Sequence, residues 1–133
     1  MNEVFVDSFY FFAILNPRDA AHAGAVDLSR RSTRPMVTTT WILTEVADGL
    51  ARSANRQVFR RLLARLRANP ENQVIPASDD LFEKGIALYD ARPDKQWSLT
   101  DCISFVVMGE RGIREALTGD HHFEQAGFTP LLK

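Results

Sequence analysis

Short apolar segments alternate with longer helical segments along this chain, and that alternation is the feature that most constrains its fold. The apolar segments are rich in β-branched and aromatic residues, which favour strands. Strands separated by helices predict parallel βαβ units, and therefore a three-layer α/β/α sandwich with a short, mainly parallel central sheet. The predicted extended segments are Val4–Val6, Met36–Thr39, Gln73–Ile75, Ser98–Thr100, Ala116–Thr118 and Thr129–Leu132.

Helical periodicity fills the intervals between these segments. Thr39 or Thr40 is suited to cap a helix that begins near Trp41, and Leu43 and Val46 give that helix an apolar face toward the core. The stretch Cys102–Met108 is apolar on nearly every side, which is typical of a buried central helix. The other predicted helices are Phe9–Leu15, Asp19–Arg31, an arginine-rich helix that ends at Asn69, and a helix capped by Ser78.

The composition is that of one ordinary domain. With 133 residues, 45% of them apolar, the chain can bury a core without disulfides or a structural metal. Its lone thiol, Cys102, fits a reducing compartment. The longest apolar run, Phe9–Leu15, has seven residues, whereas a membrane-spanning helix needs about 20. We therefore predict a single domain over residues 1–133, located in the cytoplasm, with no membrane segment.

Three aspartates follow predicted extended segments, namely Asp7, Asp101 and Asp120. Because the carboxyl ends of parallel strands lie at one edge of a sheet, we expect these side chains to lie close together. Glu45, on the polar face of its helix, is a fourth candidate. Gathered carboxylates repel one another, and a divalent cation removes that repulsion. Oxygen ligands suit Mg²⁺ or Mn²⁺, so the pattern predicts a metal site fitted to phosphoryl chemistry.

Each acid taken alone also has a purely structural interpretation. An aspartate after a strand commonly caps a helix or forms a turn, and Glu45 fits a solvated helix face. Three or four acids at one sheet edge favour function over structure. Two other acidic α/β classes fit poorly. A haloacid dehalogenase-type phosphatase needs a second aspartate where Phe9 stands, and a receiver domain needs a late lysine, which is missing between Lys95 and Lys133.

Four segments carry a more specific pattern: Val4–Ser8, Thr44–Glu45, Leu99–Ile103 and Thr118–Phe123. In this order and spacing they resemble the PIN-domain nucleases, in particular the VapC-type toxins of prokaryotic toxin–antitoxin modules. The last two segments are the most specific. The resemblance covers nearly the whole chain and implies an acidic quartet of Asp7, Glu45, Asp101 and Asp120, with Ser8 and Thr118 as hydroxyl neighbours in the pocket.

Membership of that family would imply Mg²⁺- or Mn²⁺-dependent cleavage of RNA by attack of water on a phosphodiester. It would also imply a cognate antitoxin as partner. The alternative is a catalytically silent PIN-like module that binds RNA or an antitoxin without turnover. His121 and His122 lack further histidine or cysteine partners at zinc spacing, so we expect them to be exposed loop residues. The role of Glu124 is left open.

An arginine-rich segment extends from Gly49 to Pro70, where the sequence has six arginines and no acid. On a helix, Arg56, Arg60 and Arg67 share one polar face. They are either a solvated face, a track for the RNA backbone, or a surface for an acidic antitoxin segment. Arginine suits phosphate because its planar fork donates two parallel hydrogen bonds.

The net charge of −1 is therefore a cancellation between an acidic pocket and a basic segment, and it does not exclude a nucleic-acid substrate. Phe9–Phe12 is an aromatic cluster richer than one helix face needs. We expect most of it to lie in the core. Any exposed part predicts an interface with an antitoxin or with a second copy in a homodimer.

Overall fold

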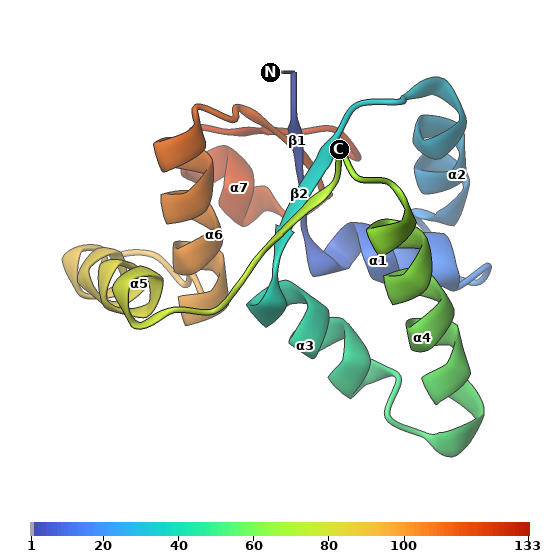
Figure 1. The fold of residues 1–133 in the computed structure, drawn as a ribbon. Coiled ribbons are helices and arrows are strands. Elements are labelled where there is room, and N and C mark those ends of the chain that lie inside the picture. The colour runs from blue at the N-terminus through green and yellow to red at the C-terminus, as the bar shows by residue number, and fades with distance from the viewer. Residues whose placement is uncertain (1) are drawn as a thin grey trace.

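The computed structural model describes residues 2–133 (Figure 1). Within these residues, five parallel strands form one sheet in the order β3-β2-β1-β4-β5. Helices cover both faces of the sheet, so the predicted α/β/α sandwich with a parallel centre is confirmed. The strands are β1 (Val4–Val6), β2 (Met36–Thr39), β3 (Gln73–Ile75), β4 (Glu115–Leu117) and β5 (Thr129–Pro130).

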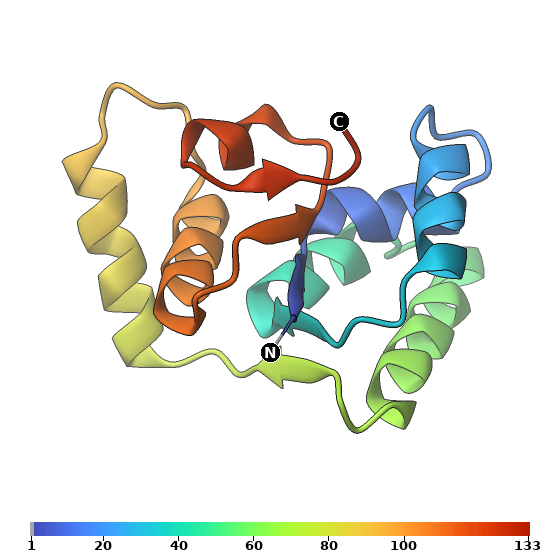
Figure 2. The same ribbon diagram turned by 90° about the horizontal axis from the view of Figure 1, so that it is seen from above.

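The helices divide between the two faces according to the connections they make (Figure 2). One face carries α1 (Ser8–Leu15), α2 (His22–Arg31) and α4 (Ser53–Ala68). The other carries α5 (Asp79–Ala91), α6 (Leu99–Arg111) and α7 (His121–Gln125), while α3 (Thr40–Gly49) extends from the end of β2. This division follows from right-handed crossovers between parallel strands. No helix within residues 2–133 is long and apolar enough to cross a membrane.

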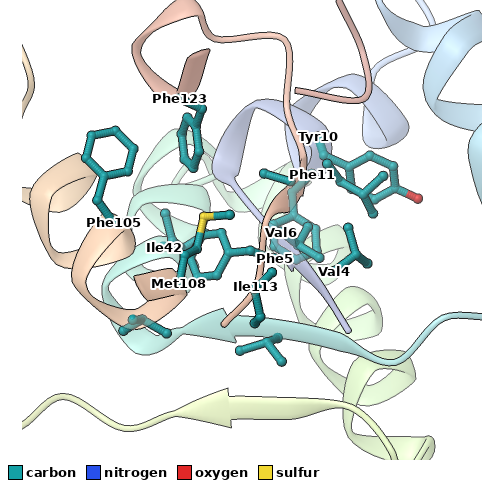
Figure 3. Close-up of a cluster of buried hydrophobic side chains, with 14 of the residues drawn as sticks. Val4, Phe5, Val6, Tyr10, Phe11, Ile42, Phe105, Met108, Ile113 and Phe123 are labelled. Carbon is teal, nitrogen blue, oxygen red and sulfur yellow. The ribbon is translucent and has the colours of Figure 1, made fainter. Parts of the chain in front are cut away.

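Strand β1 lies at the centre of the core, and all three of its residues are buried. Phe5 points toward the side of α6 and α7, whereas Val4 points to the opposite side (Figure 3). The ring of Phe5 lies 6.3 Å from that of Phe123, which packs edge-on against Phe105 at 5.0 Å. The predicted buried central helix is confirmed in α6, whose buried residues are Cys102, Ile103, Ser104, Phe105, Val107 and Met108.

The neighbouring strands β1 and β4 form the point where the topology reverses. From β1 the chain connects through α1 and α2 to β2, and from β4 it connects through α7 to β5 on the other side. Such a reversal leaves a crevice at the carboxyl ends of the two strands. Asp7 directly follows β1 and Thr118 directly follows β4, so both residues lie at this crevice.

The prediction of an extended segment at Ser98–Thr100 is wrong. Ser98 is the N-cap residue of α6, so Asp101 lies in the first turn of a helix and not at a strand end. The cause is a capping box. The Ser98 hydroxyl accepts a hydrogen bond from the Asp101 backbone N–H at 3.0 Å, and the Asp101 carboxylate accepts one from the Ser98 backbone N–H at 3.2 Å. The other predicted strands are confirmed to within two residues at either end.

Candidate active site

Four acids, each belonging to or capping a different helix, surround one cavity of about 360 Å³. Asp7 is the N-cap residue of α1, and Asp120 is the N-cap residue of α7. Asp101 comes from the first turn of α6, and Glu45 comes from α3. The structure therefore brings together all the acids that the sequence singled out, although Asp101 arrives on a helix. The cavity is also lined by Ser8, Phe9, Phe12, Gln96, Ser98 and His122.

Asp7 is the most deeply buried of these acids, with 5% of its surface exposed. Its Oδ2 accepts a hydrogen bond from the Thr118 hydroxyl at 2.8 Å. Burial raises the pKa of Asp7 to about 7, the Thr118 hydrogen bond opposes that rise, and the nearby carboxylates of Asp101 and Asp120 add to it. A carboxylate in this position is costly to ionise unless positive charge is supplied.

Thr118 connects the ends of β1 and β4. It is fully buried, it donates to Asp7, and its hydroxyl accepts a hydrogen bond from the Asp120 backbone N–H at 3.1 Å. Asp120 in turn caps α7 by accepting from the His122 backbone N–H at 2.9 Å. Thr118, which we expected to be a hydroxyl neighbour of the acids, thus contacts Asp7 directly. Ser8, the first residue of α1, lines the cavity.

Asp101 is held by α6 and by a side chain from α7. Besides its capping bond to Ser98, its Oδ2 lies 3.0 Å from Nδ1 of His122. Burial raises the pKa of Asp101, and the hydrogen bond with His122 opposes that rise. Glu45 differs from the three aspartates because its side chain is exposed at the edge of the cavity.

The donor set fits a hard divalent cation. Every acid around the cavity offers carboxylate oxygens. The charges of Asp101 and Asp120 raise the pKa of Asp7, and the charge of Asp120 raises the pKa of Asp101. Oxygen ligands with vacant positions for water and phosphate are the usual environment of Mg²⁺ and Mn²⁺. The residues present therefore suit the divalent cation that the sequence predicted.

The predicted RNA-binding arginines lie along α4, which runs antiparallel to the strands. Arg56 lies near the start of α4, and Arg67 lies roughly 16 Å farther along the helix axis. Arg60 lies between them. All three side chains are exposed. Within residues 2–133, none of the six arginines of this segment forms an ion pair.

A family model described as the PIN domain matches residues 4–129. The chain belongs to the PIN domain family. A curated relative, the 23S rRNA-specific endonuclease VapC20 of Mycobacterium tuberculosis, is 28% identical over 128 residues, which cover 96% of this chain and 97% of the relative. The match is the same for VapC20 in two strains of that species. The predicted resemblance to VapC-type PIN nucleases is confirmed.

A solved structure gives the same result for the fold. The crystal structure of Mycobacterium tuberculosis VapC20, described as a sarcin–ricin loop cleaving toxin, superposes with a TM-score of 0.84 at 27% sequence identity. The alignment covers 95% of this PIN domain and 96% of that chain. The two proteins therefore share the whole fold and not a local motif.

Five residues that line the cavity were not predicted as site residues, namely Phe9, Phe12, Gln96, Ser98 and His122. His122 was expected in an exposed loop, but it lies in the first turn of α7 with its side chain 20% exposed, whereas His121 is exposed as expected. The signal was present, because an N-cap aspartate places the residue two positions later beside its carboxylate. Gln96 precedes α6 in a loop, which sequence periodicity does not describe. Glu124, left open from the sequence, pairs with Lys133 at 2.8 Å.

Proposed function

We propose that this PIN domain is a Mg²⁺- or Mn²⁺-dependent endoribonuclease and the toxin of a VapBC-type toxin–antitoxin pair, with residues 1–133 acting as one nuclease domain. The observation that carries the proposal is the convergence of Asp7, Glu45, Asp101 and Asp120 on one cavity at the topological switch point. The match to VapC20 over almost the full length of both chains supports the same activity.

In this proposal Asp7, Asp101 and Asp120 hold the cation, and Glu45 completes the site from α3. A bound divalent cation supplies polarisation of a phosphoryl oxygen and a lowered pKa of bound water. The Thr118 hydroxyl fixes one oxygen of Asp7, and Ser8 contributes a second hydroxyl to the cavity wall. Attack by water, and not by the ribose 2′-hydroxyl, leaves a 5′-phosphate and a 3′-hydroxyl.

The substrate in this proposal is RNA. The relative's name gives 23S rRNA as its target, which makes that RNA the first substrate to test. Arg56, Arg60 and Arg67 are exposed and form no ion pair within the described residues, so their guanidinium groups can contact backbone phosphates. Nε of Arg56 donates to the Ala51 carbonyl at 2.8 Å, which leaves its terminal nitrogens for a phosphate.

A cognate antitoxin is the second partner that we propose. An apolar groove of about 820 Å³ runs between α1, α2 and α4, and Arg61 and Arg65 line it together with apolar side chains. It suits an amphipathic segment that carries acidic residues. Ala64→Arg in the groove should abolish co-purification with the product of the adjacent open reading frame, whereas Ala54→Arg, exposed elsewhere on α4, should not.

A homodimer is also part of the proposal. Tyr10 and Phe11 of the aromatic cluster are buried. Phe9 is 36% exposed, but it lines the acidic cavity together with Phe12, so the exposed part of the cluster belongs to the proposed RNA site. The exposed aromatic residues Phe82 and Tyr89 of α5 are better suited to that contact. Size-exclusion chromatography with light scattering tests the prediction, and a monomer at all concentrations would contradict it.

The decisive experiment is a cleavage assay on 23S rRNA and on total RNA with Mg²⁺, with Mn²⁺ or with EDTA. Wild type should cleave with either ion and not with EDTA, and Asp7→Asn and Asp101→Asn should be inactive. Asp48→Asn is the control, because Asp48 is exposed on α3 and does not line the cavity. RNA or antitoxin binding without cleavage, together with no calorimetric signal for Mn²⁺, would favour the catalytically silent module.

A further inference from the structure

His122 occupies the space between two of the acids in the cavity. Its Nδ1 lies 3.0 Å from Oδ2 of Asp101 and 3.5 Å from Oδ1 of Asp120. These two acids come from two different helices, α6 and α7. A single imidazole therefore spans the gap between two carboxylates that would repel each other.

The position of His122 is fixed from both sides. Its backbone N–H donates to Oδ1 of Asp120 at 2.9 Å, which is the capping bond of α7. The next residue, Phe123, is fully buried and packs edge-on against Phe105 of α6 with ring centroids 5.0 Å apart. His121 has no such constraint, because its side chain is 62% exposed and its Nδ1 lies 3.7 Å from Asp120.

The hydrogen bonds around His122 engage one oxygen of each carboxylate. Oδ2 of Asp101 accepts from the Ser98 backbone and from the imidazole. Oδ1 of Asp120 accepts from the His122 backbone and is the oxygen nearest to both imidazoles. Within residues 2–133, the second oxygen of each carboxylate has no hydrogen-bond partner. Each acid is thus oriented with one oxygen held and one available.

We propose that His122 is a positioning residue that orients Asp101 and Asp120 for the cation. The inference rests on the proposed function, because it assumes that these two acids are ligands. A nitrogen that donates to a carboxylate cannot ligate a cation through the same atom, so Nδ1 of His122 acts through the acids. Removal of a partner that orients a metal ligand in this way commonly lowers metal affinity or activity by roughly 10- to 100-fold.

The test uses three substitutions at position 122 and one matched control. His122→Ala removes the donor. His122→Asn keeps a donor nitrogen near the position of Nδ1, whereas His122→Gln moves it one bond farther from the backbone. His121→Gln is the control, since it alters a neighbouring exposed imidazole. Circular dichroism verifies that each full-length variant is folded, and the Asn and Gln variants remain informative if His122→Ala does not fold.

Calorimetric titration with Mn²⁺ and with Mg²⁺ is the first readout, and it does not depend on turnover. His122→Ala should weaken binding of both ions by about tenfold. His122→Asn should restore most of the affinity, His122→Gln should restore less, and His121→Gln should match wild type. In RNA cleavage at subsaturating metal, His122→Ala should lower kcat and leave the KM for RNA unchanged, because the arginines of α4 are untouched.

Several results would overturn the proposal. Unchanged affinity for both ions in His122→Ala would show that the imidazole does not orient the ligands. A loss confined to Mn²⁺ would make His122 a direct nitrogen ligand, since Mg²⁺ prefers oxygen. Equal metal affinity in His122→Asn and His122→Gln would show that the position of the donor nitrogen does not matter. A wild type that binds neither ion would instead contradict the metal-dependent nuclease, and one that binds both without cleaving RNA would contradict the nuclease alone.

Discussion

Replacing Asp7 by asparagine should stabilise the metal-free protein, and the gain should grow with pH. Asp7 is 5% exposed and lies near two other carboxylates. Burial, and then those neighbouring charges, raise its pKa from 3.8 to about 7. Asparagine has the same shape, can still accept the Thr118 hydrogen bond, and carries no charge at any of these pH values. The substitution therefore removes the cost of ionising a buried acid.

The sign and size follow from proton linkage. The pKa of Asp7 in the folded protein lies above its unfolded value, so its contribution to stability is fully present below pH 3.8 and is lost as the pH rises through about 7. The difference between the two pKa values corresponds to about 4 kcal/mol of unfolding free energy. Between pH 5 and pH 8, the advantage of Asp7→Asn over wild type should grow by about 3 kcal/mol.

Urea unfolding followed by circular dichroism, at pH 5, 6, 7 and 8 in EDTA, measures this difference directly. Subtracting the wild-type curve removes the titration of all other groups. Asp48→Asn, on the exposed face of α3, should show a difference that does not change with pH. At pH 8, added Mn²⁺ should stabilise wild type and not Asp7→Asn. A difference between Asp7→Asn and wild type that stays constant from pH 5 to pH 8 would refute the reasoning.

Three further predictions concern residues around the cavity. Thr118→Val should lower the unfolding free energy by about 2 kcal/mol at pH 8, because an ionised Asp7 loses its buried donor; the loss should shrink at pH 5 in the same urea assay. Ser98→Ala should lower the unfolding free energy by about 1 kcal/mol in the same urea assay, since it removes the N-cap of α6. It should also weaken Mn²⁺ binding, because the capping box that it disrupts orients Asp101. Arg56→Gln should raise the KM for RNA and reduce the salt dependence of binding by about one phosphate contact. An unchanged KM and an unchanged salt dependence in Arg56→Gln would contradict a track for the RNA backbone along α4.

Local sequence pattern was sufficient for the strands that form the centre of the sheet. Val4–Val6 and Met36–Thr39 have the predicted bounds because β-branched and buried residues occur together there. The same criterion failed at Ser98–Thr100, where the composition favours a strand but a capping box with Asp101 begins a helix. The spacing of serine and aspartate was the stronger signal, because it satisfies two backbone donors at once.

The contact of His122 with Asp101 could not be read from the sequence in the same way. Its two partners lie 21 positions apart, and they meet because α6 and α7 pack through Phe105 and Phe123. Local periodicity describes each helix separately and does not report which side chains meet across them. The four acids were easier to predict, because the carboxyl ends of parallel strands, and the starts of the helices that follow them, lie at the same edge of the sheet.

The structural and functional interpretations of the aspartates are compatible with each other. Asp7 and Asp120 are N-cap residues, and Asp101 completes a capping box, so each aspartate lies at a helix N-terminus. The partial positive charge there favours a carboxylate by about 0.5 kcal/mol for each helix. That gain is far smaller than the cost of about 4 kcal/mol that the raised pKa of Asp7 represents. The Asp7 side chain also makes no capping hydrogen bond. Position at a helix N-terminus therefore leaves most of the charge of Asp7 uncompensated, which is why the cavity is better explained by a bound cation than by capping alone.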